Sequence, residues 1–466
     1  MSETKTFPIK TKHQYDVIVV GGGTTGIAAA MASARHGART AIVESLAFLG
    51  GNAVNIPAWM GFHNLQGQQV VRGIAWELIE KLRKVGGATQ TYLDPITSSV
   101  TGTSGNWVKI IATQEAAAAG VAVWLQSLAV DVRVERVDDQ AHIHGVYVFN
   151  REGLHLYEGK VIVDCTDTGE IARMAGANMI RGRAGDHKVQ VSSWTVTVGN
   201  VDFEKLLAYF AAHPDQIRPF PLKDPEALLD QMHTAEVFVM GSFKQLIQQA
   251  KADGLPLPRA VFPAVAFPQV GEVMHVASRV EDVDPNDAAN NARAQIEGMR
   301  QTQVWMTFLQ RYVPGFEHCR LVTTPSHLGV RETNHMEGEY LVTQEDLMTG
   351  RTFDDVIALG GYHLDIHTPD HAGLETMHPP TYQIPYRCLV PRGVDGLLVA
   401  GRAISATHEA QSSTRVIPIS MAQGQAAGTA AALAVQYKVS PRDVDIHELQ
   451  ATLVSDNCEI GQSLIR

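Results

Sequence analysis

The run Val17-Ile18-Val19-Val20-Gly21-Gly22-Gly23-Thr24-Thr25-Gly26 decides how this chain begins to fold. Four successive apolar residues predict a fully buried strand, and the Ala-rich stretch 27–35 predicts a helix that starts at the last glycine. Gly21 permits a tight turn, Gly23 lets the backbone approach a pyrophosphate, and Gly26 lets helix and strand pack closely. The helix N-terminus supplies free N–H groups and the positive end of a dipole for phosphate.

Glu44 supplies the second half of this pattern. Residues 41–43 predict the neighbouring parallel strand, and Glu44 follows it, 18 residues after Gly26. At that distance an acidic side chain accepts hydrogen bonds from ribose hydroxyls. Glycine triplets also occur in ordinary turns, but this one lies between a predicted strand and a predicted helix. The sequence therefore predicts a βαβ unit that binds a dinucleotide.

The composition limits the classes of partner. The 466 residues are 45% hydrophobic and 19% charged, and the net charge is −11, which argues for a globular chain and against nucleic acid or a membrane surface as partner. No run approaches the roughly 18–20 apolar residues of a membrane helix, and the first residues lack the apolar core of a signal peptide. Four widely separated cysteines without a Cys-x-x-Cys motif suit a reducing compartment. We therefore expect a cytoplasmic protein.

The composition and the pattern of predicted elements change twice along the chain. Residues 14–190 alternate predicted strands and short helices, whereas proline clusters and long amphipathic stretches such as 288–312 mark residues 191–384. Residues 385–440 return to the pattern of residues 14–190, with a predicted strand at 396–400 and a predicted helix of small residues at 419–435. We predict a first domain at 14–190 that is completed by 385–440, an inserted domain at 191–384, and a C-terminal extension at 441–466.

Further glycine-rich segments distinguish a flavin from a nicotinamide. Gly50-Gly51-Asn52 follows Glu44 and lets the backbone pass close to a second stretch of ligand. Gly401-Arg402 ends the strand at 396–400, and residues 424–428 give the following helix a face without bulk. A nicotinamide enzyme needs neither feature, so the sequence favours a flavin dinucleotide.

These motifs are joined by others at 163–169, 329–332, 338–340, 365–367 and 396–402. Together they resemble the FAD-dependent oxidoreductases of the glutathione-reductase-like superfamily, in the half that includes fumarate reductase and L-aspartate oxidase. The resemblance implies an α/β fold. It consists of a Rossmann-like FAD-binding domain, made of a parallel sheet plus a β-meander, and an inserted α+β substrate or cap domain. Linked relatives carry a histidine before the glycine pair, where this chain has Leu49, so the resemblance implies non-covalent FAD.

Carried over residue by residue, the resemblance implies several contacts with FAD. Glu44 would meet the adenosine ribose, and Val130 lies where the family's backbone contacts adenine. Asp164 and Gly169 would form a strand-end turn beneath the cofactor, and the helix at 424–428 would point its N-terminus at the flavin ring. The full set of expected cofactor residues is Gly21, Gly23, Thr25, Gly26, Glu44, Ser45, Gly50, Gly51, Asn52, Val130, Asp164, Gly169, Gly401, Arg402, Gly424 and Ala426.

Two segments carry the candidate catalytic groups. Arg415 follows the cofactor strand and precedes the helix expected to face the flavin, where a guanidinium could bind a substrate carboxylate or stabilise a reduced flavin. In the run 360–367, alternation would place His363, Asp365 and His367 on one face. A histidine base with an orienting carboxylate is one interpretation, and a two-histidine, one-carboxylate metal site is the other. Because flavin chemistry gives a metal no task, we expect none. Arg331 fits a cap-domain arginine that faces the substrate.

These observations predict an FAD-dependent dehydrogenase or oxidase that takes a hydride from a small polar organic substrate. No second glycine fingerprint for a nicotinamide cofactor is present, so the electrons would pass to an external acceptor such as oxygen, a quinone or a redox protein. A flavin-dependent reductase of an activated C=C bond is the first alternative. A non-catalytic or RNA-modifying flavoprotein is the second, and the acidic composition argues against it. Whether the chain forms a homo-oligomer stays open.

Overall fold

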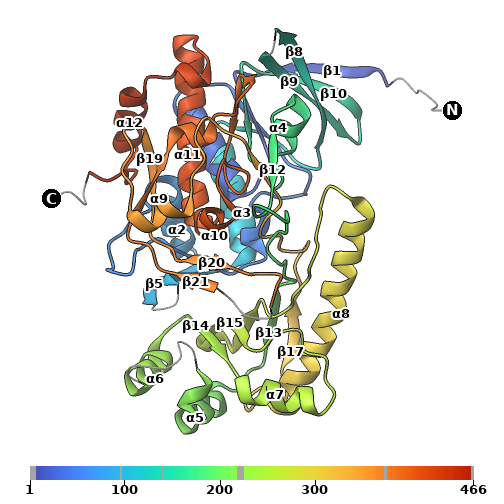
Figure 1. Ribbon diagram of the computed structural model, residues 1–466, viewed down its shortest axis with the longest axis vertical. Coiled ribbons are helices and arrows are strands. Elements are labelled where there is room, and N and C mark those ends of the chain that lie inside the picture. Colours follow the sequence, from blue (N-terminus) through green and yellow to red (C-terminus); the bar gives the residue numbers. More distant parts are fainter. Residues whose placement is uncertain (1–6, 95–96, 139, 218–224, 372–374, 463–466) are drawn as a thin grey trace.

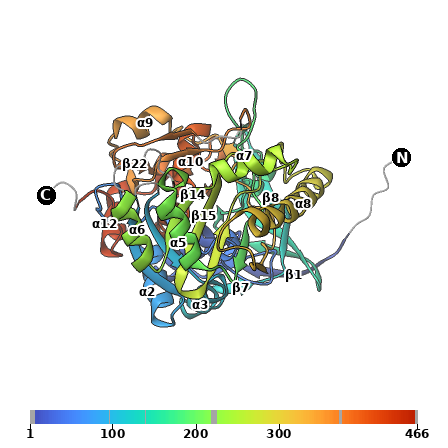
Figure 2. The ribbon, with the colours of Figure 1, turned by 90° about the horizontal axis from the view of Figure 1, so that it is seen from below.

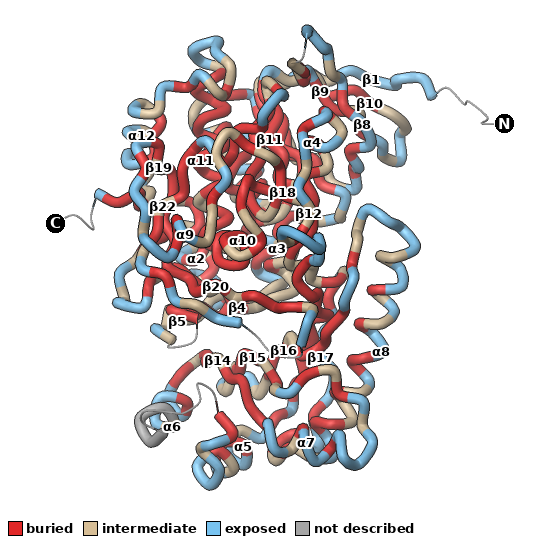
Figure 3. Tube along the Cα trace, viewed as in Figure 1, coloured by how far each residue is buried: buried red, intermediate tan, exposed pale blue. Residues whose placement is uncertain are grey.

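The computed structural model describes residues 7–94, 97–138, 140–217, 225–371 and 375–462. The chain forms two lobes: a main lobe, which holds both ends, and a small lobe made of residues 194–330 (Figure 1). Each lobe has its own buried hydrophobic core, and the outer helices of the small lobe expose one face (Figure 3). Within the described residues, no helix is long and apolar enough to cross a membrane.

The main lobe is built around a five-stranded parallel sheet in the order β24-β11-β2-β3-β7. Its strands are β2 (Val17–Val20), β3 (Thr40–Val43), β7 (Ala122–Trp124), β11 (Val161–Asp164) and β24 (Leu397–Val399). Val17 and Val19 pack in the core on one face of the sheet, and Ile18 and Val20 in the core on the other. Burial on both faces explains why these strands are unbroken apolar runs.

A second sheet lies against the parallel one. Its strands β8 (Leu128–Val137), β9 (Gln140–Asn150) and β10 (Gly153–Glu158) form an antiparallel meander. β1 (Ile9–Gln14) joins β10, and β23 (Val394–Asp395) joins β9, both in parallel. The predicted combination of a parallel sheet and a β-meander is confirmed.

Helices cover the opposite face of the parallel sheet. α1 (Thr24–Arg35) follows β2, and α11 (Ile417–Tyr437) packs beside it. A Cβ atom added at Gly424 would lie 2.2 Å from the carbonyl oxygen of Thr25, and one at Gly428 would lie 2.0 Å from that of Ala29. The small residues of α11 therefore allow its backbone to touch that of α1. α2 (Gly73–Lys84), α3 (Gly105–Ala118) and α12 (Ile446–Ser455) complete this layer.

The small lobe is an antiparallel sheet in the order β14-β15-β16-β13-β17, backed by helices. The strands are β13 (Val196–Gly199), β14 (Phe238–Ser242), β15 (Phe262–Phe267), β16 (Glu272–His275) and β17 (Arg320–Thr323). The helices are α5 (Phe203–Ala212), α6 (Pro225–Thr234), α7 (Lys244–Ala252) and α8 (Ala288–Tyr312). Seen from below, α5 and α6 lie on the side of β14, and α8 lies on the opposite side of the lobe (Figure 2). The helix predicted at 288–312 is confirmed at both ends.

The core packing divides the chain differently from the predicted boundaries. The core of the small lobe uses residues 194–328, whereas Val342, Leu359 and Tyr382 pack in the core of the main lobe. The predicted end of the insertion at 384 is therefore too late, because the apolar residues beyond 340 find their partners on α11 and its neighbours. Leu449 and Leu453 of α12 also belong to that core, so residues 441–462 are part of the main lobe and not an extension.

Smaller elements complete the structure. β4 (Ala58–Met60), β5 (Ala88–Asp94) and β6 (Ser98–Thr103) form a three-stranded sheet, and β12 (Met179–Arg181) pairs with β18 (Asn334–Met336). β19 (Val356–Gly360) pairs with β22 (Tyr382–Pro385), and β20 (Leu364–Ile366) with β21 (Glu375–Met377). The short helices are α4 (Glu170–Ala175), α9 (Gln344–Thr349) and α10 (His408–Thr414).

Candidate active site

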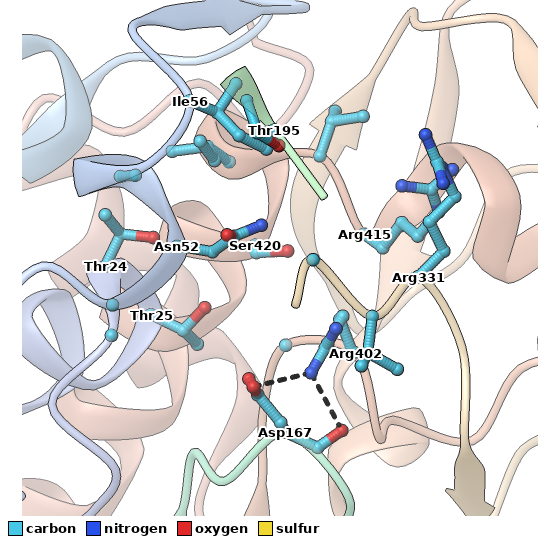
Figure 4. A pocket seen from close by; sticks show the side chains of 18 of the residues that line it. Thr24, Thr25, Asn52, Ile56, Asp167, Thr195, Arg331, Arg402, Arg415 and Ser420 are labelled. Carbon is cyan, nitrogen blue, oxygen red and sulfur yellow. Dashed lines mark hydrogen bonds and ion pairs between the residues drawn. The ribbon is translucent and has the colours of Figure 1, made fainter. Parts of the chain in front are cut away.

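A cavity of about 540 Å³ lies between the carboxyl ends of the parallel strands and the sheet of the small lobe. The residues that follow β2, β3, β11 and β24 line one part of it, and β14, β15 and β16 line another. In α/β folds ligands bind outside the carboxyl ends of the strands, so the cavity occupies the position that the fold prepares. Figure 4 shows Thr24, Thr25 and Asn52 on one side and the guanidinium groups of Arg331 and Arg415 on the other.

The glycine-rich turn has the geometry that its sequence predicts. Gly21 has a φ of +101°, and a Cβ there would lie 2.4 Å from the carbonyl oxygen of Cys165. A Cβ at Gly26 would lie 1.8 Å from the carbonyl oxygen of Gly21, so the helix and the turn are in direct contact. At Gly23, by contrast, no heavy atom of the described chain beyond its neighbours lies within 4 Å of the Cβ position. The middle glycine therefore faces open space at the N-terminus of α1.

That helix end is free to receive an anion. Gly23 is the N-cap residue, and no side chain of the described residues caps the first N–H groups of α1. An uncapped helix N-terminus beside a cavity is a site for phosphate, because its N–H groups and dipole favour negative charge. Gly51 lies against this turn, since a Cβ at Gly51 would be 2.9 Å from the Cα of Gly23.

Glu44 lies at the edge of the same cavity. Its Oε2 accepts a hydrogen bond from the backbone N–H of Gly22 (2.6 Å), and its Oε1 accepts one from the N–H of Leu46 (2.7 Å). The side chain of Ser45 also donates to Oε1, over 3.1 Å. These bonds fix the carboxylate at the end of β3, where it lines the cavity beside the glycine-rich turn.

Asp365 collects the predicted catalytic groups at the other end of the cavity. Its Oδ2 lies 3.1 Å from Nε2 of His367 and 3.3 Å from Nη2 of Arg415, and its Oδ1 lies 3.7 Å from Nε2 of His363. Nη1 of Arg331 donates to the carbonyl oxygen of Val191 (2.7 Å) and to Oγ of Ser193 (2.8 Å). Arg331, His363, Asp365, His367 and Arg415 all line the cavity. The expectation that the residues of 363–367 share a face is confirmed.

The protonation of this cluster follows from its burial. Burial, assisted by the charge of Arg331, lowers the pKa of His367 to about 3. Burial alone would raise the pKa of Asp365, but its interactions with His367 and His363 hold that pKa well below its usual range. His367 is therefore neutral and Asp365 ionised at pH 7. Because Nε2 of His367 faces a carboxylate, it carries the ring proton, and Nδ1, which has no hydrogen-bond partner among the described residues, keeps its lone pair.

Sequence reasoning missed a third arginine. Arg259, between α7 and β15, is 3% exposed, and its Nε donates to the carbonyl oxygen of Ser278 (3.2 Å). Its Nη2 is buried without a partner in the part of the chain that the structure describes. Burial and then Arg279 lower its pKa to about 10, and its charge helps to lower the pKa of Arg331. No motif surrounds Arg259 in the sequence, so only the packing of the small lobe brings it to this site.

A second buried group lies behind this cluster and was also missed. Glu332 accepts hydrogen bonds from Nε2 of His335 (2.9 Å), Nδ1 of His408 (2.7 Å) and the backbone N–H of Gln190 (2.8 Å). Burial would raise the pKa of Glu332, but the two histidines outweigh it and lower the pKa to about 2. Its position next to Arg331 in the sequence was the one signal that could have found it.

Two glutamines connect this buried group to the cavity. Oε1 of Gln190 accepts from the backbone N–H of His367 (3.2 Å), and its Nε2 donates to Oε1 of Gln411 (3.1 Å). Nε2 of Gln411 in turn donates to the carbonyl oxygen of Arg331 (2.8 Å). The network therefore holds the backbones of Arg331 and His367 in fixed relation to each other.

Comparison with known proteins shows the family. The family described as FAD dependent oxidoreductase matches residues 16–453. The chain is a member of that family. It is 33% identical over 76 residues to glutathione reductase of Schizosaccharomyces pombe (16% of this chain, 14% of the relative). It is 42% identical over 45 residues to the soluble pyridine nucleotide transhydrogenase of Hahella chejuensis (10% of each chain). The chain thus matches only a small part of these curated relatives.

Solved structures are similar to the chain at low identity. A geranylgeranyl bacteriochlorophyll reductase-like protein of Thermoplasma acidophilum is 13% identical, with a TM-score of 0.44 over 96% of this chain and 85% of that one. The p-nitrophenol 4-monooxygenase PnpA of Pseudomonas putida is 11% identical, with a TM-score of 0.44 over 92% of this chain and 82% of that one.

The cavity of this FAD-dependent oxidoreductase fits FAD. The uncapped N-terminus of α1, the open space at Gly23 and the carboxylate of Glu44 suit a pyrophosphate and a ribose in succession. Nine of the expected cofactor residues line the cavity: Gly21, Gly23, Thr25, Glu44, Ser45, Gly51, Asn52, Gly401 and Arg402. Arg402 forms an ion pair with Asp167 (2.8 Å), which Figure 4 shows.

The structure places the remaining expected cofactor residues elsewhere. Gly26 and Gly50 support the turn from behind, where N–H of Gly50 donates to the carbonyl oxygen of Gly22 (2.8 Å). Gly424 packs on the backbone of Thr25, and Ala426 lies in the core of the main lobe, so neither lines the cavity. The cavity is instead lined by Val416, Ile417 and Ser420, at the N-terminus of α11. The N-terminus of this helix therefore faces the cavity, and its lining residues lie one to two turns before Gly424.

Three other expected residues lie near strand ends. Val130, whose backbone is expected to contact adenine, follows Leu128 and Ala129, which line the cavity, but is not itself among the lining residues. Asp164 is fully buried and accepts from the N–H groups of Thr166 and Ala172 (2.9 Å each), which shapes the turn between β11 and α4. Gly169 caps α4 with a φ of +66°. Both residues form the expected turn, but Cys165, Thr166 and Asp167 line the cavity.

The segment 363–367 has the residue types of a two-histidine, one-carboxylate metal site. Among the residues that the structure describes, no three His, Cys, Asp or Glu side chains are arranged to hold a metal ion. Here Nε2 of His363 and Nε2 of His367 both face the same carboxylate of Asp365. This arrangement suits hydrogen bonding, with one carboxylate orienting an imidazole.

Proposed function

We propose that this enzyme takes a hydride from a small organic substrate that carries a carboxylate or similar anion. FAD, when bound, supplies the hydride acceptor. The observation that supports the proposal is the charge of the cluster: the carboxylate of Asp365 lies among the guanidinium groups of Arg259, Arg331 and Arg415. Such a cluster keeps an excess of buried positive charge, which an anionic substrate would offset.

Arg331 and Arg415 differ in the contacts that hold their guanidinium groups. Arg331 is held by Val191 and Ser193, and its pKa is well below its usual range because of burial and the nearby Arg259 and Arg415. That lowered pKa means that the guanidinium gains when a negative charge enters the cavity. Arg415 contacts Asp365 over 3.3 Å, a distance that leaves the guanidinium able to turn toward a substrate carboxylate.

His367 supplies the base in this proposal. Its Nδ1 accepts the proton that leaves the substrate with the hydride, and Asp365 stabilises the imidazolium through Nε2. The two electrons then pass to an external acceptor. The same groups could run in the opposite direction, with His367 returning the proton to an activated C=C bond.

Anaerobic mixing with a library of carboxylic acids tests the proposal. Bleaching of the flavin absorbance by an acid identifies an oxidised substrate, and reoxidation of photoreduced protein by an unsaturated acid identifies the reverse reaction. The Arg331→Gln and Arg415→Gln variants should stay yellow. In each, the affinity for the responding acid should fall by a factor of about 10 or more, because one charge-assisted hydrogen bond is lost. Arg300→Gln, on the exposed side of α8, is the matched control. Unchanged responses in both cavity variants would refute an anion site at these arginines.

A further inference from the structure

One wall of the cavity is apolar and begins beside the arginines. Val239, Val265 and Met274 are paired across β14, β15 and β16, so their side chains form a row on one face of the small-lobe sheet. All three line the cavity, together with Val276 from the small lobe and Ile56 and Met60 from the main lobe. Several of these side chains also pack in a small hydrophobic cluster between the lobes.

Ser193 connects this wall to the anion site. Its Oγ accepts from Nη1 of Arg331 (2.8 Å) and lies 3.3 Å from the carbonyl oxygen of Val276. Val276 in turn donates its N–H to the carbonyl oxygen of Pro263 on β15 (3.1 Å). The apolar surface therefore begins at Val276, and Ser193 alone links this residue to the guanidinium of Arg331. Val239, Val276, Ile56 and Met60 are half-buried and present apolar surface to the cavity.

We infer that the substrate is an amphipathic monocarboxylic acid, with its carboxylate on Arg331 and Arg415 and a hydrocarbon body along this wall. The inference rests on the proposed function and narrows its substrate class. A second carboxylate on the far end of the substrate would lie against valine and methionine side chains. Burying a charge there without a partner is costly, so a dicarboxylate of the same length should bind more weakly.

Ligand binding to the FAD-loaded full-length protein tests this without turnover. The probes are acetate, butyrate and hexanoate, with succinate and adipate as dicarboxylates that match butyrate and hexanoate in length. Binding of each probe is measured by the change in flavin absorbance and by the change in melting temperature. Each added methylene should tighten binding about three- to fourfold while the wall has room. Hexanoate should bind at least about tenfold more tightly than adipate.

Variants of the wall separate the substrate from the cofactor. Val239→Thr and Val265→Thr keep the side-chain volume but add a hydroxyl. They should therefore weaken the binding of hexanoate and leave the binding of acetate and the FAD content unchanged. Val322→Thr, on the exposed strand β17 of the same sheet, is the control.

Three results would overturn the inference. They are affinities that do not change with chain length, tighter binding of adipate than of hexanoate, or loss of FAD from the Val239→Thr and Val265→Thr variants. If no acid binds and Arg331→Gln has no effect, the anion site itself fails, which is a different result from anion binding without a preference for chain length.

Discussion

Gly23 and Gly26 are three residues apart, yet a side chain would meet different surroundings at each. The Cβ position at Gly23 faces open space, whereas at Gly26 it lies 1.8 Å from the carbonyl oxygen of Gly21. One glycine is therefore required by the ligand and the other by the fold. The sequence motif alone treats them as equals.

We predict that Gly23→Val yields folded, colourless protein, because the new side chain occupies the space for the pyrophosphate. Gly26→Val should instead fail to fold, since it would displace the turn itself. The flavin-to-protein absorbance ratio and the far-ultraviolet circular dichroism of both variants check this. A Gly23→Val protein with full FAD content would show that the open space at this turn does not hold the cofactor.

His367 should control the acid side of the pH profile. Its pKa of about 3 in the free enzyme keeps Nδ1 unprotonated down to strongly acidic pH, so kcat/KM should not fall between pH 8 and 5 through this group. A bound carboxylate partly offsets Arg331, the charge that helps to lower this pKa, so the acid limb of kcat should lie at higher pH than that of kcat/KM.

We predict that His367→Asn keeps its FAD but reduces flavin about 10²–10⁴-fold more slowly, the usual cost of losing a general base. Stopped-flow flavin reduction across pH, with an oxidised acid from the library, is the measurement. His144→Asn, an exposed position on the meander, serves as the control. A wild-type rate in His367→Asn would assign the proton to another group.

At the scale of elements, the contact between α1 and α11 fixes two helix N-termini at one cavity. Gly424 allows this contact, because any side chain there would strike the carbonyl oxygen of Thr25. The helix is therefore built from small residues for packing reasons, and its effect on the cofactor is indirect. A glycine in a long helix otherwise lowers stability by roughly 0.5–1 kcal/mol relative to alanine.

We predict that Gly424→Val destabilises the protein by more than about 1–3 kcal/mol, the usual cost of overpacking, since the clash is with backbone. FAD affinity should fall with it, because the displaced α11 carries Ile417 and Ser420. Ala422→Val, on the same helix and only partly buried, introduces the same side chain without the clash. Equal urea midpoints for the two variants would contradict the packing argument.

The buried group around Glu332 joins three segments that meet behind the cavity. Its carboxylate has a pKa of about 2, below the ordinary value of 4.5. A carboxylate with a lowered native pKa contributes stability that is present above about pH 4.5 and is lost as the pH falls toward 2. This stabilisation belongs to the arrangement of the segments and not to any one helix.

We predict that Glu332→Gln loses about 3–5 kcal/mol of unfolding free energy at pH 7, as for the removal of one partner from a buried ion pair. Its stability should also depend less on pH between about 5 and 2 than that of the wild type. Glu337→Gln, which removes a partly exposed ion pair with Arg392, should cost at most about 1 kcal/mol. Urea unfolding of the apoprotein across this pH range gives both quantities, and similar losses in the two variants would contradict the buried role.

At the scale of the whole molecule, the cavity that fits FAD lies between groups that belong to distant parts of the chain. The cavity is lined by residues from Val20 to Ser420, on both lobes. A ligand that bridges so many segments binds the native state and not the unfolded chain, so it stabilises the fold by mass action.

We therefore predict that free FAD at 100 times its dissociation constant stabilises the apoprotein by about 2.7 kcal/mol. Acid precipitation of the holoprotein should leave all flavin in the supernatant. Differential scanning calorimetry and the absorbance of the supernatant are the measurements. Flavin that stays with the precipitated chain would contradict non-covalent binding, and a melting temperature that does not respond to FAD would contradict a bridging site.

The sequence by itself determined the parts of the site that depend on local geometry. The strand, the glycine turn, the helix and Glu44 lie within 28 residues, and each residue has a steric or hydrogen-bonding reason that neighbours in the chain impose. The alternation in 363–367 likewise predicted a shared face, because side-chain direction in an extended segment follows from the backbone.

Tertiary structure decided everything that depends on register and on contacts between distant segments. Gly424 packs on the backbone of Thr25 and Ala426 lies in the core, away from the cavity, because small helical residues serve packing and ligand contact equally well. Arg259 and the apolar row across β14–β16 had no motif at all. Their roles arise only when the small lobe folds over the main lobe, since long-range packing, unlike a turn, leaves no fixed spacing in the sequence.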